Sequence, residues 1–421
     1  QKDADAKGLK RNDLVWVESV RGKVKVRVET GGDLLGGQYY ADNGDLVIRS
    51  GGKLDTGQKV GSGASAKPLY TTLALGDAQA KVRAHDALNI QAVLNPHLII
   101  QSTGTRGNIA DASDAKWSLF STYGENSSVS LNSLNGVVKQ HEATLMTSAY
   151  NSAVNNPRLN FDIRRPFYTI NMLRILPSSF SATAYQGDVS LDMQSAILSP
   201  ASTGNLTLLA AGGVTIAGSV VMSDMDKLPS PITPGEDDDQ FGAGSLQSIL
   251  QSPPPAVIPV HIGDTEPVRI YAVGGDVSGA VNKFNLKLPK QTLIRAGRDI
   301  ANLGVSIQHI DSANVSVLQA GRDLRFESQE SRSPNALVWV SGPGRLEVTA
   351  GRHIDLGTSA GISSRGNIDN PALPVDGADI HIAAGVGAAG IDYAGAVDRL
   401  LAKLETGSPD DTTLWLARWL T

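Results

Sequence analysis

One short sequence occurs three times with small changes: Ala296-Gly297-Arg298-Asp299-Ile300, Ala320-Gly321-Arg322-Asp323-Leu324 and Ala350-Gly351-Arg352-His353-Ile354. The copies begin 24 and 30 residues apart, and a degraded fourth copy, Ala384-Gly385, follows further on. In Leu346-Glu347-Val348-Thr349-Ala350, apolar and polar residues alternate, which indicates a strand with one face inside and one in water. Each Ala fits a tight inner corner, and the following Gly permits either a positive φ or a close approach of two backbones.

Similar glycine-punctuated strands occur earlier in the chain, for example Gly44–Gly52, Gly187–Met193, Gly204–Leu208 and Gly275–Val277. A single unit of this kind cannot bury its own apolar face, whereas a stack of such units can, and periods of 20–50 residues are the sign of a solenoid. Short strands joined by short turns favour an all-β parallel β-helix over a helical solenoid. At about 25 residues per coil, the chain is long enough for roughly 15 coils.

The composition excludes several functions. The chain has 421 residues, of which 44 are glycine and none is cysteine, and 37 basic against 42 acidic residues give a net charge of −5. That charge disfavours general nucleic-acid binding, which needs a basic face. The lack of cysteine excludes disulfides, thiolate zinc sites and thiol nucleophiles. No apolar run is long enough for a transmembrane helix. Because the polar start at Gln1 lacks an initiator Met, we interpret the chain as a segment of a longer precursor.

Changes of pattern along the chain predict its organisation. Prolines and an acidic run break the alternation at 226–259, because proline cannot donate to a strand ladder. Near the C-terminus the period changes to that of an amphipathic helix, with apolar residues at Tyr393, Val397, Leu400, Leu401 and Leu404. This helical segment either caps the last coil or begins a further domain. The predicted parts are a less regular β-helical section (1–160), β-helix (161–225), a loop excursion (226–259), β-helix with the repeated corners (260–392) and a helical segment (393–421).

Three motifs resemble known binding sites but lack the required context. Gly385–Gly390 matches G-x-G-x-x-G, but too little chain follows for the second strand of a dinucleotide site. Gly357–Gly361 matches the G-x-S-x-G of hydrolases, but a turn-rich segment follows where that motif needs a helix. The acidic run 236–239 lacks the spacing of a calcium loop. We therefore predict no cofactor and no metal site.

Two clusters have the residue types of a polysaccharide lyase or glycosidase, which use paired carboxylates or a base beside acids. They are Asp162/Arg164/Arg165 and Arg352/His353/Asp355. Since Arg and Asp recur at the same corner in each copy, we expect them to stack as charge ladders between coils. We predict no catalytic residue.

The repeated corners, together with the blocks Gly204–Gly213, Pro267–Ala272, Gly275–Val277, Leu288-Pro289-Lys290 and Gly344–Gly366, resemble the filamentous-haemagglutinin-type exoproteins of two-partner secretion in Gram-negative bacteria. The resemblance covers about 180–393. It implies a right-handed parallel β-helix, export through a cognate outer-membrane barrel, and a secreted or surface-exposed product.

The family's usual role, again by resemblance, is adhesion to a host or bacterial surface receptor or glycan, associated with virulence and without catalysis. Two alternatives remain open. The first is a polysaccharide lyase or glycosidase on the same scaffold. The second is the stalk of a contact-dependent toxin whose effector domain lies beyond Thr421.

Overall fold

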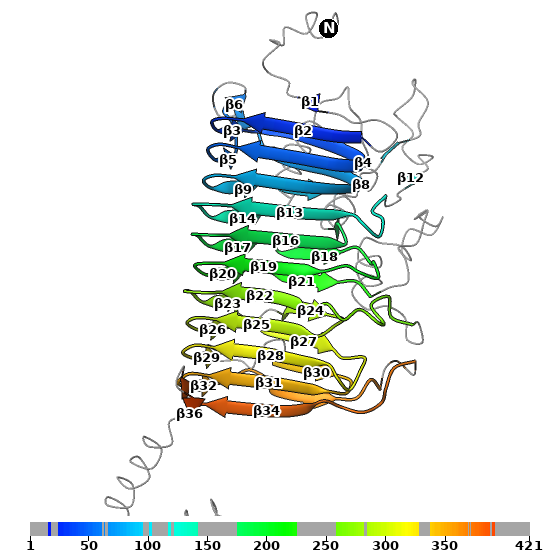
Figure 1. Cartoon of the computed structure of the whole chain (residues 1–421), viewed down its shortest axis with the longest axis vertical. Helices are drawn as coiled ribbons and strands as arrows, with labels where there is room; N and C mark the ends of the chain where they lie inside the picture. The colour runs from blue at the N-terminus through cyan, green and yellow to red at the C-terminus, as the bar shows by residue number, and fades with distance from the viewer. Residues whose placement is uncertain are drawn as a thin grey trace, which may run out of the picture.

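The computed structural model describes residues 16–17, 24–60, 63, 66–95, 101–102, 117–118, 122–141, 175–224, 258–281, 284–327, 337–368, 370, 372–387 and 390–391. Throughout these ranges the regular elements are β-strands, and nearly all of them belong to three parallel sheets, two that extend along the described stack and a third that begins at Ile175 (Figure 1). The chain passes from sheet 1 to sheet 2 to sheet 3 and back in each coil where all three are present. The predicted all-β solenoid of stacked parallel coils is therefore confirmed.

Sheet 1 contains β1 (Trp16–Val17), β2 (Val24–Thr30), β4 (Gly37–Ser50), β8 (Thr71–Ala84), β10 (Ala92–Leu94), β13 (Ser128–Ser133), β16 (Ser179–Ala184), β19 (Leu206–Ala210), β22 (Val268–Ala272), β25 (Thr292–Ala296), β28 (Val315–Ala320), β31 (Arg345–Ala350) and β34 (Asp379–Ala384). Sheet 2 contains β3 (Leu34–Leu35), β5 (Leu54–Asp55), β9 (Leu88–Ile90), β14 (Val138–His141), β17 (Val189–Asp192), β20 (Val214–Ile216), β23 (Val277–Gly279), β26 (Ile300–Ala301), β29 (Leu324–Arg325) and β32 (Ile354–Asp355). Sheet 3 contains β15 (Ile175–Leu176), β18 (Ser195–Leu198), β21 (Ser219–Met222), β24 (Phe284–Leu288), β27 (Gly304–Gln308), β30 (Leu337–Ser341) and β33 (Gly361–Arg365). Three small antiparallel pairs complete the set: β6 (Lys59–Val60) with β7 (Lys67–Pro68), β11 (Gln101–Ser102) with β12 (Trp117–Ser118), and β35 (Val386–Gly387) with β36 (Gly390–Ile391).

The core lies between the three sheets, where the alternation of each strand places its apolar residues. In β31, Leu346, Val348 and Ala350 have no exposed surface, and the residues between them face outward. The last residue of most sheet 1 strands is small, and these residues pair in register from coil to coil: Ser50, Ala84, Ser133, Ala184, Ala210, Ala272, Ala296, Ala320, Ala350 and Ala384. This column makes the sharp inner corner that the sequence predicts.

The corner glycines are required by close approach and not by a positive φ. Gly297, Gly321 and Gly351 are absent from the positive-φ residues of the described chain. A Cβ on Gly321 would overlap the carbonyl oxygen of Gly297, and one on Gly351 would overlap that of Gly321. The sequence allowed either a positive φ or a close approach of two backbones as the reason for these glycines. At these three corners the structure shows the close approach.

In the described ranges, eleven successive coils follow one another through sheet 1, from β2 to β34. The roughly 15 coils expected from length counted every residue of the chain as coil, whereas connections such as the 13 residues between β33 and β34 contribute no strand. Among the described coils, the corner between sheets 1 and 2 always has three or four residues. The helical segment predicted for 393–421 and most of the excursion predicted for 226–259 lie outside the described residues.

Candidate functional site

The repeated corners form the predicted charge ladder along the ridge between sheets 1 and 2. The Arg322 guanidinium donates to both carboxylate oxygens of Asp299, one coil earlier, at 3.0 Å each. Arg352 makes the same two-pronged pair with Asp323. Each acceptor carboxylate also takes a backbone N–H from the next coil, as Asp299 does from Asp323 at 3.2 Å. The ladder therefore fixes the vertical register of successive corners.

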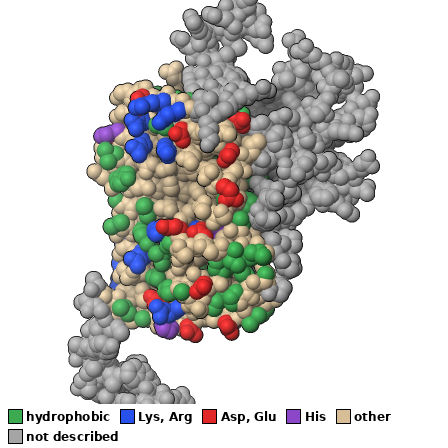
Figure 2. Space-filling model, turned by 45° about the vertical axis from the view of Figure 1, so that its right-hand side comes forward, with side chains coloured by type: hydrophobic (Ala, Val, Ile, Leu, Met, Phe, Trp, Pro, Cys, Tyr) green, Lys and Arg blue, Asp and Glu red, His purple; other side chains and the backbone are tan. Residues whose placement is uncertain are grey.

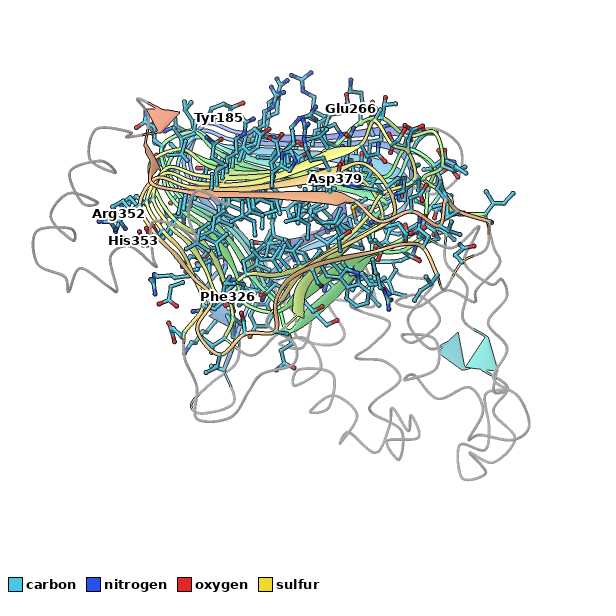
Figure 3. The ribbon with its side chains drawn as sticks, turned by 90° about the horizontal axis from the view of Figure 1, so that it is seen from below. Tyr185, Glu266, Phe326, Arg352, His353 and Asp379 are labelled. Atoms are coloured by element: carbon cyan, nitrogen blue, oxygen red, sulfur yellow. The ribbon has the colours of Figure 1, made fainter. Side chains whose placement is uncertain are left out.

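The candidate catalytic cluster Arg352/His353/Asp355 does not converge. Arg352 is engaged by Asp323, while Asp355 accepts the backbone N–H of Gly357 at 3.0 Å. In the view along the axis, Arg352 and His353 point outward from one corner of the three-sided cross-section, and Phe326 marks another corner (Figure 3). Burial opposes ionisation of Asp323, but the hydrogen bonds and charge of Arg352 outweigh it and lower the pKa of that carboxyl. The cluster has the properties of a structural ion pair.

The other sequence motifs have structural surroundings of their own. Gly357–Gly361 spans the turn after β32 and ends on the first residue of β33, so the motif leads into a strand and not a helix. Gly385–Gly390 lies around the β35–β36 hairpin, with residues 388–389 outside the described part. Asp162/Arg164/Arg165 and the acidic run 236–239 also lie outside it. Within the described ranges, no three His, Asp or Glu side chains gather in a way that would hold a metal ion.

A buried ionic cluster, which sequence reasoning did not identify, lies where the chain re-enters the stack before β22. Lys290 is 1% exposed, and its Nζ donates to the carbonyl oxygen of Gly204 at 2.9 Å and to a carboxylate oxygen of Asp264. His261, equally buried, places its Nδ1 3.5 Å from the same carboxylate. Lys290 thus ties together the coil before the re-entry, the re-entering segment and the coil after it.

Burial sets the direction of the pKa shifts of His261, Lys290 and the neighbouring Asp224. It lowers the pKa of His261 to about 4, with Lys290 adding to the effect, so the imidazole is neutral at pH 7. It also lowers the pKa of Lys290, although Asp264 opposes this. Nearby, burial raises the pKa of Asp224 to about 7 against the hydrogen bond that its carboxylate accepts from the His261 backbone N–H. We call Lys290, Asp264, His261 and Asp224 the stem clamp, because they join the two ends of the segment 225–257.

The outer face of sheet 1 carries a second feature, a concentration of positive charge in its first coils. Its outward basic residues are Lys25, Arg27, Arg49, Lys81 and Arg83, and all are exposed. In the rows that these residues form across the three strands, the acidic residues are Glu29 and Asp45, and Glu29 pairs with Arg27 and Arg49 at 2.7 and 3.0 Å. Asp42 of β4 and the exposed Asp77 of β8 lie outside these rows. Figure 2 shows Lys and Arg side chains gathered at this end of the stack. We call these five residues the basic patch.

The register of the strands brings the basic patch together. Arg49 of β4 lies opposite Glu29 of β2 and Arg83 of β8, so two guanidinium groups occupy one outward row. The overall charge of −5 hides this local excess. The alternation in the strands identifies which residues face outward, but only the register shows that they are neighbours.

Comparisons with protein-family models, with curated proteins and with solved structures find no match to this chain. Among the residues that the structure describes, no helix is of a length and apolarity that would let it cross a lipid bilayer.

Proposed function

We propose that this chain is a non-catalytic, structural and adhesive segment of a secreted or surface-exposed exoprotein of the filamentous-haemagglutinin type. Its coils carry the outer face of sheet 1 as a flat contact surface, and the basic patch contacts anionic groups on a host or bacterial surface. The observation that carries the proposal is this patch, which is exposed on a stiff stack of coils in a chain of negative net charge.

The export route follows from the resemblance and is part of the same proposal. A cognate outer-membrane barrel passes the chain unfolded to the cell exterior. Each coil then docks its apolar face on the coil before it, and the burial of side chains such as Leu346 and Val348 supplies free energy where no ATP is present. We also infer that the coils wind right-handed, because connections between parallel strands of one sheet are right-handed in about 98% of cases.

A comparison with other basic side chains that form ion pairs inside the stack of coils supports the adhesive role of the basic patch. Arg322 and Arg352 are used in the ladder between coils, and Lys290 is used in the stem clamp. In the rows of the basic patch, by contrast, five cations stand beside two carboxylates, those of Glu29 and Asp45, on an exposed strand surface. Arg49 and Arg83 lie on adjacent strands, about 4.8 Å apart, with Arg27 and Lys81 in the next row, and such closely spaced cations suit a polymer with repeated negative charges.

Binding of the purified chain to surface-immobilised cells and to a panel of neutral and acidic glycans tests the proposal. The variant Lys81→Gln/Arg83→Gln removes two cations from the patch without touching the core. Lys139→Gln is the matched control, since Lys139 is an exposed cation on sheet 2. We expect the double variant to bind at least tenfold more weakly, the control to bind normally, and the difference to shrink as salt screens the surface charge.

Equal binding by the double variant and the control would remove the patch from the proposal. Turnover of any glycan in the same panel would replace adhesion with the alternative of a polysaccharide-degrading enzyme.

A further inference from the structure

One row of the core in sheet 1 is polar in two successive coils. In the other coils from β2 to β34 this row is occupied by apolar residues: Val26, Leu46, Ala80, Val129, Phe180, Leu206, Val268, Leu346 and Ile380. In β25 and β28 the same row holds Thr292 and Ser316, and neither has any exposed surface. Hydroxyl groups in this row give up apolar burial and need hydrogen-bond partners inside the core.

The partner is His309, in the corner that leads from β27 into β28. Its imidazole has no exposed surface, and its Nδ1 lies 2.7 Å from the carbonyl oxygen of Pro343 while its Nε2 lies 2.7 Å from Oγ of Ser316. Ser316 Oγ also accepts the backbone N–H of Thr292 at 2.9 Å. Because Thr292 belongs to β25 and Pro343 precedes β31, these hydrogen bonds connect three successive coils.

The directions of these hydrogen bonds require a neutral imidazole. The carbonyl oxygen of Pro343 can only accept, so Nδ1 of His309 carries the proton and Nε2 accepts the hydroxyl proton of Ser316. If Nε2 also carried a proton, it would turn a donor toward this hydroxyl, and the hydroxyl proton would lose its acceptor inside the core. A buried charge and a buried hydroxyl without an acceptor both destabilise the folded chain.

The surroundings of the ring favour the same neutral form. Burial lowers the pKa of His309 below its ordinary 6.5, and the hydrogen bond to Pro343 opposes this shift only in part. The folded chain therefore binds this proton less readily than the unfolded chain. The stability that neutral His309 contributes is complete above pH 6.5 and is lost as the pH falls below it.

The charged residues near this corner are engaged with other groups. Lys290 contributes only its carbonyl oxygen to the network, to the Thr292 hydroxyl, and its ammonium group is bound by Asp264. The Asp311 carboxylate accepts a backbone N–H of its own turn, and Arg345 pairs with its neighbour on β31. Within the described ranges, no charged side chain shifts the pKa of the imidazole.

We propose that His309, Ser316 and Thr292 form an acid-sensitive latch that holds three coils together at the corner between sheets 3 and 1. At neutral pH the latch is closed. In acid the imidazole takes up a proton, its hydrogen bond from Ser316 is lost, and the coils from β25 to β31 open locally at this corner. The ladder at the corner between sheets 1 and 2 keeps the stack assembled. The latch does not depend on the proposed adhesive function.

Hydrogen exchange of the full chain at pH 7.5 and pH 5.5, corrected for the intrinsic effect of pH on exchange, tests the latch. We expect peptides that cover β28 and β31 to exchange roughly tenfold faster at the lower pH, and peptides that cover β13 and β16, in coils without the latch, to show no such increase. Asp224 titrates in the same range with the opposite sign, but it lies beside β21 and outside the latch peptides.

Two variants assign the effect to one histidine. His309→Gln, whose amide takes up no proton in this range, should abolish the increase at low pH. His353→Gln is the matched control, since His353 is an exposed histidine at the corner between sheets 1 and 2, and it should keep the full increase. An unchanged exchange rate in the original chain, or an equal increase in both variants, would overturn the proposal.

A second measurement keeps the proposal testable if His309→Gln does not fold. Nitrogen-15 spectra of the histidine-labelled full chain show which ring nitrogen carries the proton, and Ser316→Ala identifies the signal of His309 by shifting it. We expect a neutral ring with its proton on Nδ1 at pH 7. A charged ring at that pH, or a proton on Nε2 in place of Nδ1, would contradict the latch.

Discussion

The stacking of the corner glycines makes one prediction that compares the same substitution at two equivalent corners. Gly321 and Gly31 both follow the last residue of a sheet 1 strand. At Gly321 a Cβ would overlap the carbonyl oxygen of Gly297 in the coil before, whereas at Gly31, in the first described coil, it would meet nothing within 4 Å. Neither residue has a positive φ, so Gly→Ala tests the close approach alone.

The overlap at Gly321 is with backbone, which cannot rotate away as a side chain can. Overpacking of this kind costs about 1–3 kcal/mol, and we expect the upper end, about 3 kcal/mol, because two corners must separate. Gly31→Ala should cost nothing and should stabilise the chain by about 0.4–1 kcal/mol, since alanine reduces the freedom of the unfolded chain.

Hydrogen exchange measures the cost locally, which suits a stack whose coils open separately. At 1.4 kcal/mol per factor of ten, a loss of about 3 kcal/mol speeds exchange roughly 100-fold. This increase should appear in peptides that cover β25 and β28 of Gly321→Ala, whereas peptides that cover β2 and β4 of Gly31→Ala should exchange about two- to fivefold more slowly than in the original chain. Equal effects at the two positions would refute the explanation by stacking.

Three further predictions concern the stem clamp. Lys290→Met leaves the Asp264 carboxylate buried without its partner, so the free energy of unfolding should fall by about 3–5 kcal/mol, read from the denaturation midpoint. Adding Asp264→Leu should recover part of this loss. If the double variant recovers nothing, the two side chains are not coupled. Burial puts the pKa of Asp224 at about 7, above its ordinary 3.8, so the protonated acid favours folding and stability is lost as pH rises through 7. Asp224→Asn should flatten this part of the profile in melts between pH 4 and 8, and an unchanged slope would contradict the assignment. Replacing 225–257 by a short Gly-Ser linker should leave the melting temperature unchanged, because the His261 backbone N–H and the Asp224 carboxylate already hold the two ends together; a large drop would show that the clamp does not act alone.

The stacked architecture was predictable because its rule is local. Alternation in Leu346–Ala350 fixes which face is buried, and the Ala-Gly pair marks the corner, so the recurrence of both at 24 and 30 residues is enough to predict coils. The reason for each corner glycine was not predictable, since a positive φ and a close approach select the same residue. Only the position of the preceding coil decides, and it selects close approach at Gly321 and a positive φ at Gly385.

The sequence did not predict the stem clamp, because its residues are far apart in the chain. Lys290 is 86 residues from Gly204 and 26 from Asp264, and no period in the sequence relates these distances. The three meet because β22 pairs with β19 although residues 225–257 lie between them in the sequence, and the alternation pattern does not say which strands pair across such an interval. A lysine after Leu288-Pro289 also looks like an ordinary turn residue, although its ammonium group is buried.

The three corners of a coil differ in how much change they tolerate, and this difference explains where the chain varies. At the corner between sheets 1 and 2, the glycine permits contact with the coil before, and the ladder of Asp299, Arg322, Asp323 and Arg352 binds each corner to the next. In the described coils this corner accommodates at most one extra residue, as after β13, β16 and β22, where it has four residues in place of three. The connections at the other two corners vary more in length, from two residues between β17 and β18 to 13 residues between β33 and β34. A solenoid built in this way keeps one ridge constant for assembly and leaves its other two corners to carry the segments that vary.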